Sequence, residues 1–187
     1  MPKSRIGVAL AIALAIGGCA TAPLPPGPAT TAGPVEYRLG AGDKLRITTF
    51  NEPNLTGEFV VSSNGAIALP LAGEIPAKGS TPAELERAVQ ERLASGGFVL
   101  KPRVSAEIIE YRPYYILGEV TKPGQYNYLV GLTVSKAVAT AGGFTYRANT
   151  KRVFITRDGR NQEEEVTLTA ASPVGPGDTI RIGERTF

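Results

Sequence analysis

The chain has 187 residues and a formal net charge of +3, with one cysteine and no histidine. These counts exclude an intrachain disulfide framework, a histidine metal site and a histidine general base. The 22 glycines and 15 prolines indicate many turns and a β-rich protein, and the length allows one medium domain or two small ones.

The first 18 residues have the pattern of a secretory signal. Lys3 and Arg5 precede the apolar run 6–16, which is shorter than the roughly 20 residues that a transmembrane helix needs. Residues 16–19, IGGC, resemble the lipobox of bacterial lipoproteins, with Ile in place of the common Leu and Gly in place of Ala or Ser. The alternative is an ordinary signal peptide that happens to contain a cysteine.

We expect residues 1–18 to be a lipoprotein signal peptide and Cys19 to be lipidated, which would anchor the protein to a membrane. By the lipoprotein sorting rule, Ala20 in place of Asp implies the periplasmic face of the outer membrane. Residues 20–34, ATAPLPPGPATTAGP, have neither charge nor periodicity. We therefore interpret residues 19–36 as a lipidated, extended tether rich in Pro, Ala and Thr.

The folded part is expected to begin at residue 37 with a turn and a strand. Gly40 and Gly42 permit a sharp turn, and Asp43 can accept hydrogen bonds from nearby backbone N–H groups. Alternating residues then predict a half-buried strand, with one face formed by Leu45, Ile47 and Thr49 and the other by Arg46, Thr48 and Phe50. Further on, Asn64-Gly65 between two extended segments, 58–62 and 66–70, predicts a hairpin of type I′.

A helix and a strand are predicted next. Thr81-Pro82-Ala83-Glu84 is a capping box with proline at the first helical position, and Gly96-Gly97 is a stop signal. The apolar stripe between them comprises Leu85, Ala88, Val89 and Leu93. The strand that follows has one face made of Val104, Ala106 and Ile108.

The second half has the pattern of a small β-grasp unit. Two extended segments, 114–120 and 125–128, flank the turn sequence TKPG, and residues 133–141 have helical spacing that Gly142-Gly143 terminates. A strand over 152–157, a turn at Asp158-Gly159 and a returning segment, 163–169, predict a hairpin.

One motif occurs twice. Residues 175–182, GPGDTIRI, repeat residues 40–47, GAGDKLRI, with five of eight positions identical. We interpret both copies as structural turns that start a β-strand, with the aspartate as a local cap, in preference to two acidic functional sites. The turn residues are Gly40, Gly42, Asp43, Gly175, Gly177 and Asp178.

The successive segments YRLGAGDKLRI, VVSSNGAIALPLAGEI, LGEVTKPGQY and AGGF resemble those of the outer-membrane polysaccharide export protein family. The resemblance implies an α+β fold of two β-rich domains in tandem, a polysaccharide export domain over 37–112 and a soluble-ligand-binding β-grasp domain over 113–187. It also implies a homo-oligomeric ring around a central passage, an inner-membrane polysaccharide copolymerase or chain-length regulator as partner, and polysaccharide as cargo. Longer members carry an extra β-grasp repeat and a C-terminal membrane helix. We expect this short form to lack that helix and to need a separate outer-membrane β-barrel protein.

Six of the seven tyrosines lie between residues 111 and 146. Aromatic faces can stack on sugar rings, so the candidate polysaccharide or subunit contacts are Tyr114, Tyr126, Tyr128 and Tyr146, together with Arg147. The alternative is that these tyrosines form the core of a small domain. A basic cluster also occurs here, formed by Arg147, Lys151, Arg152, Arg157 and Arg160. It would attract an acidic polysaccharide, or it is the solvated side of a strand balanced by the glutamates at 163–165.

We expect a component that is not an enzyme. The only cysteine is at the lipidation site and histidine is absent, so the usual nucleophile–base pairs cannot be built, and no cofactor, metal or nucleic-acid partner is expected. The predicted function is a lipid-anchored part of a capsular or exopolysaccharide export translocon that forms an oligomeric conduit. The alternatives are a monomeric glycan-binding or sensory outer-membrane lipoprotein and a purely structural envelope lipoprotein.

Overall fold

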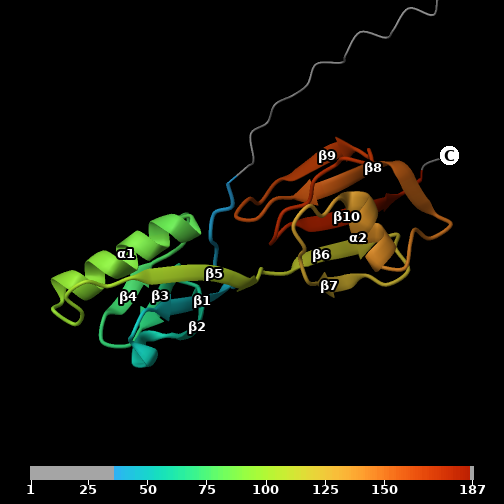
Figure 1. Ribbon diagram of the computed structural model, residues 1–187. Coiled ribbons are helices and arrows are strands. Elements are labelled where there is room, and N and C mark those ends of the chain that lie inside the picture. The colour runs from blue at the N-terminus through green and yellow to red at the C-terminus, as the bar shows by residue number, and fades with distance from the viewer. Residues whose placement is uncertain (1–35, 186–187) are drawn as a thin grey trace, which may run out of the picture. The chain divides into compact units, whose positions relative to one another are not determined.

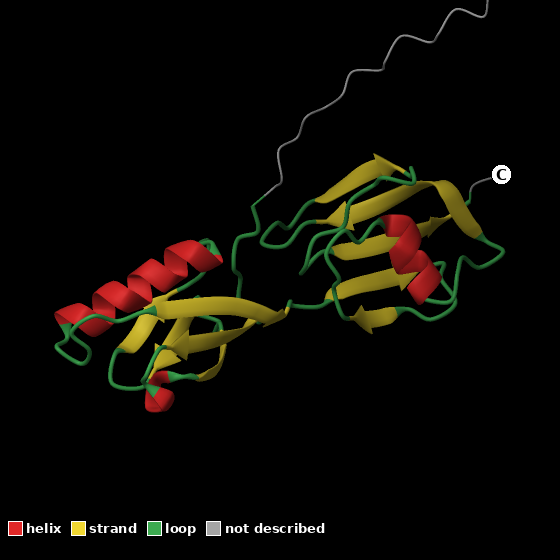
Figure 2. Ribbon diagram, in the orientation of Figure 1, coloured by secondary structure: helices red, strands yellow, loops and turns green. Residues whose placement is uncertain are grey.

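Two hydrophobic cores, each built from consecutive strands and one helix, make up the part of the chain that the computed structural model describes, residues 36–185 (Figure 1). The predicted signal peptide, Cys19 and all of the tether before residue 36 lie outside the described residues. The α+β class predicted from the sequence is confirmed, because both helices pack beside sheets (Figure 2). No helix within residues 36–185 is long and apolar enough to cross a membrane.

The first core lies between a three-stranded antiparallel sheet and a helix. The sheet order is β2-β1-β5, from β1 (Lys44–Thr49), β2 (Gly57–Val60) and β5 (Val104–Glu110). A short 3-10 turn, η1 (Pro53–Leu55), connects β1 to β2. The alternation predicted for β1 is confirmed, since Leu45, Ile47 and Thr49 are buried.

The helix of this part is α1 (Pro82–Ser95), and its predicted signals are confirmed. Thr81 Oγ1 accepts from the Glu84 N–H at 3.2 Å while the Glu84 carboxylate accepts from the Thr81 N–H at 2.8 Å. These hydrogen bonds satisfy two of the backbone donors that every helix start leaves unpaired. Leu85, Val89 and Leu93 are buried, so the apolar stripe faces the core.

The hairpin predicted at Asn64-Gly65 is wrong in both turn type and pairing. Strand β3 (Ala66–Leu69) pairs with β4 (Gly73–Pro76), while β2 pairs with β1. A type I′ turn needs positive φ at both central residues, but here Gly65 has positive φ (83°) and Asn64 does not. The Asn64 side chain instead accepts from the Ala66 N–H at 3.1 Å, so Asn64 itself does not take a left-handed conformation.

The second core lies under a five-stranded mixed sheet of order β7-β6-β10-β8-β9. The strands are β6 (Tyr114–Gly118), β7 (Gly124–Tyr126), β8 (Ala148–Thr156), β9 (Glu163–Thr167) and β10 (Thr179–Glu184). The predicted β8–β9 hairpin is confirmed. Strand β10 lies parallel to β6 and antiparallel to β8, so the last strand of the chain occupies the centre of the sheet.

Helix α2 (Val134–Thr140) lies across one face of this sheet (Figure 2). Thr133 caps it, its Oγ1 accepting from the Lys136 N–H, and Val134, Ala137 and Val138 are buried beneath it. Gly142 and Gly143 both have positive φ, which lets the chain turn sharply after the helix as predicted. A mixed sheet with one short helix across it is the β-grasp arrangement that the sequence predicted.

Candidate functional site

The two copies of the G-x-G-D motif form the same local structure. Asp43 accepts a hydrogen bond from the Gly40 N–H at 2.7 Å, and Asp178 accepts one from the Gly175 N–H at 2.7 Å. Both aspartates are buried, and each lies directly before the strand that follows it, β1 or β10. Each carboxylate therefore shapes the turn from which a central strand begins.

Each buried aspartate also binds an arginine. Asp43 Oδ2 lies 3.0 Å from Arg112 Nη1, and Asp178 Oδ2 lies 2.7 Å from Arg157 Nη1. A buried carboxylate is costly unless it is paired and hydrogen-bonded, and these arginines supply the compensating charge.

Arg112 connects the two motifs. Its Nη2 lies 3.0 Å from Asp158 Oδ2, and the Asp158 N–H donates to Asp178 Oδ1 at 3.1 Å. We call the set formed by Asp43, Arg112, Asp158, Asp178 and Arg157 the aspartate–arginine network. Sequence reasoning missed Arg112 and Asp158, because neither residue belongs to the repeated motif and they are far apart in the chain.

The glycines of the motifs make room for this arginine. A Cβ on Gly40 would lie 2.2 Å from Arg112 Nη1, and a Cβ on Gly177 would lie 2.9 Å from Arg112 Nε and 2.7 Å from Asp158 Cγ. Real Cβ atoms do not approach other atoms so closely, so the aspartate–arginine network in this geometry requires glycine at both positions. Gly177 also has a φ of 84°, which favours glycine.

Tyr37 belongs to the same cluster of polar groups. Its hydroxyl donates to Asp43 Oδ2 at 2.6 Å and accepts from Arg112 Nη1 at 2.8 Å. Burial, together with the adjacent Asp43 carboxylate, raises the pKa of the Tyr37 hydroxyl far above its usual range near 10. The hydroxyl therefore remains a hydrogen-bond donor to Asp43.

One of the four candidate contact tyrosines is not available to a ligand. Tyr114 is 1 % exposed and stacks on Tyr126 at a centroid distance of 5.9 Å, so its assignment as a polysaccharide or subunit contact is wrong. Alternate side chains of a strand point to the same face, so Tyr114 lies on the core-facing side of β6 together with the buried Ile116. Tyr126 is half-buried, and its hydroxyl donates to the Lys122 carbonyl at 2.7 Å.

Tyr128 borders an open apolar hollow. It meets Tyr111 edge to face at 5.5 Å, and Tyr111 meets Tyr37 in the same way at 4.9 Å. The hollow has a volume of about 530 Å³. We call it the Tyr128 hollow; it is lined by Ile109, Glu110, Tyr111, Asn127, Tyr128, Leu129 and Val130. Leu129 and Val130 are strongly exposed there.

Tyr146 stands between two further hollows and is 83 % exposed. The larger, which we call the Tyr146 hollow, has a volume of about 460 Å³ and is lined by Thr145, Tyr146, Ala148, Asn149, Thr150, Lys151, Arg152 and Arg185. The smaller has a volume of about 150 Å³ and is lined by Tyr146, Arg147, Glu184 and Arg185. Arg147 pairs with Glu184 at 2.8 Å.

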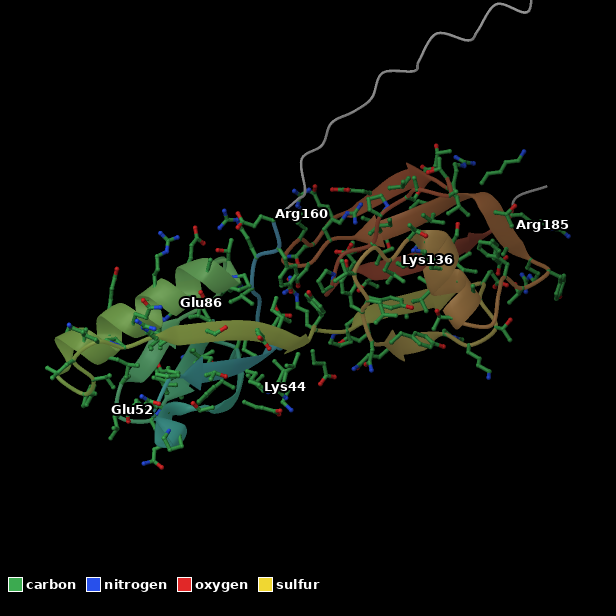
Figure 3. The ribbon with its side chains drawn as sticks, viewed as in Figure 1. Lys44, Glu52, Glu86, Lys136, Arg160 and Arg185 are labelled. Carbon is green, nitrogen blue, oxygen red and sulfur yellow. The ribbon has the colours of Figure 1, made fainter. Side chains whose placement is uncertain are left out.

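The basic cluster of the sequence is divided along the five-stranded sheet. Its members Lys151 and Arg152 line the Tyr146 hollow with Arg185, whereas Arg160 lies at the opposite end of the sheet from Arg185 (Figure 3). Arg152 pairs with Glu165, while Arg157 and Arg160 both pair with Glu164. Ion pairs with the glutamates at 163–165 therefore balance the charges of these three arginines, as the alternative interpretation of the cluster expected. Lys151 makes no ion pair with any residue in the described range 36–185.

Within residues 36–185, no group of three acidic, cysteine or histidine side chains is arranged to hold a metal ion.

Comparison with known proteins gives matches over both halves of the chain. Residues 31–109 match the family described as polysaccharide biosynthesis/export protein, and residues 113–168 match the SLBB domain. The chain is 33 % identical over 173 residues to the exopolysaccharide production protein ExoF of Rhizobium meliloti (strain 1021), a match that covers 80 % of this chain and 41 % of that protein.

A second relative is the EPS I polysaccharide export outer membrane protein EpsA of Ralstonia nicotianae. It is 27 % identical over 183 residues, covering 80 % of this chain and 48 % of that protein. The chain thus spans less than half the length of these curated relatives. The resemblance that the sequence motifs indicated is confirmed: the chain belongs to the polysaccharide export protein family, with an export domain and an SLBB domain in tandem.

Proposed function

We propose that this chain is a component of an envelope export system for a capsular polysaccharide or exopolysaccharide. The observation that carries the proposal is the tandem of export and SLBB domains, together with matches over 80 % of the chain to relatives named for exopolysaccharide production and export. In this role the chain makes and breaks no bond. It guides the polymer by packing with further copies of itself into a conduit.

The location that fits this role is the periplasmic face of the outer membrane, with acyl chains on Cys19 as the anchor. Support comes from the lipobox-like residues 16–19 and from the printed name of EpsA, an outer membrane protein. The partners are an inner-membrane copolymerase or chain-length regulator, a separate outer-membrane protein and the polysaccharide.

Subunit contact is the proposed use of the Tyr128 hollow. Leu129 and Val130 expose large apolar side chains beside the aromatic rings of Tyr111 and Tyr128. Burying such side chains gains about 25 cal/mol per Å² of apolar surface, so a second copy of the chain seated there would be held by apolar packing.

Deletion and complementation of the gene test the export role. Deletion should abolish secreted polysaccharide, and the full chain should restore it. Unchanged secretion after deletion would remove the export proposal. A Cys19→Ser variant should restore little secretion, whereas full restoration by that variant would overturn the anchor alone.

Light scattering on the full lipidated chain in detergent tests the conduit. We expect a multimer, and we expect the double variant Leu129→Ser/Val130→Ser to shift it to smaller species. Leu100→Ser is the matched control, because Leu100 is almost fully exposed and lies outside the hollow. A monomer at high concentration with measurable oligosaccharide affinity would favour the glycan-binding lipoprotein instead.

A further inference from the structure

The Tyr146 hollow combines a strongly exposed aromatic ring with three basic side chains, and no acidic side chain lines it. We propose that it binds an acidic sugar residue of the exported polymer, with a carboxylate as the recognised group. This inference rests on the proposed export function and adds to it the chemical class of the cargo.

Charge is the first argument. Lys151, Arg152 and Arg185 line the hollow, and no acidic residue does. Arg152 shares its charge with Glu165 at 2.8 Å, but Lys151 has no ion-pair partner among the described residues. A carboxylate entering the hollow would gain charge-assisted hydrogen bonds, which are about twice as strong as neutral ones.

The aromatic ring is the second argument. Tyr146 contributes to neither hydrophobic core, so its exposure is not explained by packing. A tyrosine ring offers an apolar face on which a sugar ring can stack, and its hydroxyl can hydrogen-bond to sugar hydroxyls. Such a ring adds large contact area at low cost in conformational entropy.

The local backbone holds this surface in place before any ligand arrives. The Thr145 N–H donates to the Glu119 carbonyl at 3.1 Å, and the Arg147 N–H donates to Thr145 Oγ1 at 3.3 Å. On the other side, Asn149 Oδ1 accepts from the N–H groups of Lys151 and Arg152 at 2.9 and 3.2 Å. A preformed site loses less entropy on binding, so modest contacts suffice.

The smaller hollow extends the surface on which the polymer can lie. Tyr146 and Arg185 line both hollows, so a linear glycan that stacks on Tyr146 reaches from one into the other. The smaller hollow contains Glu184, whose charge is paired with Arg147 at 2.8 Å. Arg147 and Arg185 line the same hollow, so a glycan that extends into it meets basic side chains there as well.

Calorimetric titration of the full chain with defined oligosaccharides tests the proposal. The probes are hyaluronan oligosaccharides, in which acidic and neutral sugars alternate, oligogalacturonates, in which every sugar is acidic, and neutral malto-oligosaccharides. We expect both acidic probes to bind more tightly than the neutral probe. Added salt should weaken binding of both acidic probes, because partly exposed charges are screened.

Matched substitutions locate the site. Lys151→Gln should weaken hyaluronan binding by about tenfold or more, the scale of one lost charge-assisted hydrogen bond. Tyr146→Ala should also weaken hyaluronan binding, because it removes the stacking surface. The controls are Tyr115→Ala, an exposed tyrosine on β6, and Lys136→Gln, an exposed lysine on α2 that Figure 3 labels, and both should leave affinity unchanged.

Several results would overturn the proposal. Equal affinity for neutral and acidic probes would remove the charge argument, and unchanged affinity in Tyr146→Ala would remove the site. A Tyr146→Ala variant that changes particle size but not affinity would make this surface a subunit contact. None of these results would contradict the export role if deletion of the gene still abolishes secretion. The export proposal and the sugar-binding proposal can therefore be refuted independently.

Discussion

Arg112 holds Asp43 through two separate groups. Its backbone N–H donates to Asp43 Oδ1 at 2.9 Å, and its guanidinium Nη1 donates to Asp43 Oδ2 at 3.0 Å. The same guanidinium pairs with Asp158 at 3.0 Å. The Arg112 side chain, between β5 and β6, therefore connects the Asp43 turn before β1 to the Asp158 turn after β8.

Arg112→Met should be among the most destabilising single substitutions in the described chain. It leaves Asp43 buried without its counter-charge, which costs about 3–5 kcal/mol of unfolding free energy. Denaturant unfolding followed by circular dichroism measures the loss. Arg160→Met is the control, since its pair with Glu164 is exposed and such pairs contribute about 0–1 kcal/mol. A loss of unfolding free energy in Arg112→Met no larger than that in Arg160→Met would contradict the stabilising role of the Arg112–Asp43 pair.

The two aspartates that bind Arg112 should differ in importance. The Asp43 side chain is 0 % exposed, whereas that of Asp158 is 47 % exposed. Water can replace the lost interaction at Asp158 but not at Asp43, so Asp158→Asn should cost about 1 kcal/mol and Asp43→Asn several times more. Comparison of the two unfolding midpoints checks the order, and a larger effect at Asp158 would contradict it.

Gly40→Ala should destabilise the protein through one added methyl group. The new Cβ would lie 2.2 Å from Arg112 Nη1, and relief of the clash must move a guanidinium that binds Asp43. Overpacking of this kind costs about 1–3 kcal/mol. Gly57→Ala is the matched control, because its Cβ would meet only the Phe59 ring at 3.6 Å, an ordinary contact. Thermal unfolding of both variants decides whether the space beside Arg112 is needed.

Tyr37→Phe should change how stability depends on alkaline pH. The Tyr37 pKa is raised in the folded protein, so this group's contribution is complete below its unfolded pKa, about 10, and is lost as pH rises above that value. The wild type should therefore lose part of its advantage over Tyr37→Phe between pH 10 and 11.5. Unfolding free energies of both proteins from pH 8 to 11.5 provide the measurement, and a pH-independent difference would refute the assignment.

Signals that involve only near neighbours in the chain could be interpreted from the sequence alone. The capping box at Thr81 and Glu84, the glycines after both helices and the alternation of β1 all depend on residues a few positions apart. Their physical causes are hydrogen bonds to the adjacent backbone and the period of one regular element, so the folded structure leaves them unchanged.

The choice of partners was decided by the tertiary structure. The Asn64-Gly65 turn gave no indication that β2 would pair with β1 and β3 with β4, nor that β10 would enter the sheet between β6 and β8. The same holds for Arg112, which meets Asp43 across 69 positions of sequence. The sequence determined the two G-x-G-D turns, but only the packing of both cores determined which arginine would reach them, because a buried carboxylate takes whichever cation the fold brings within hydrogen-bonding distance.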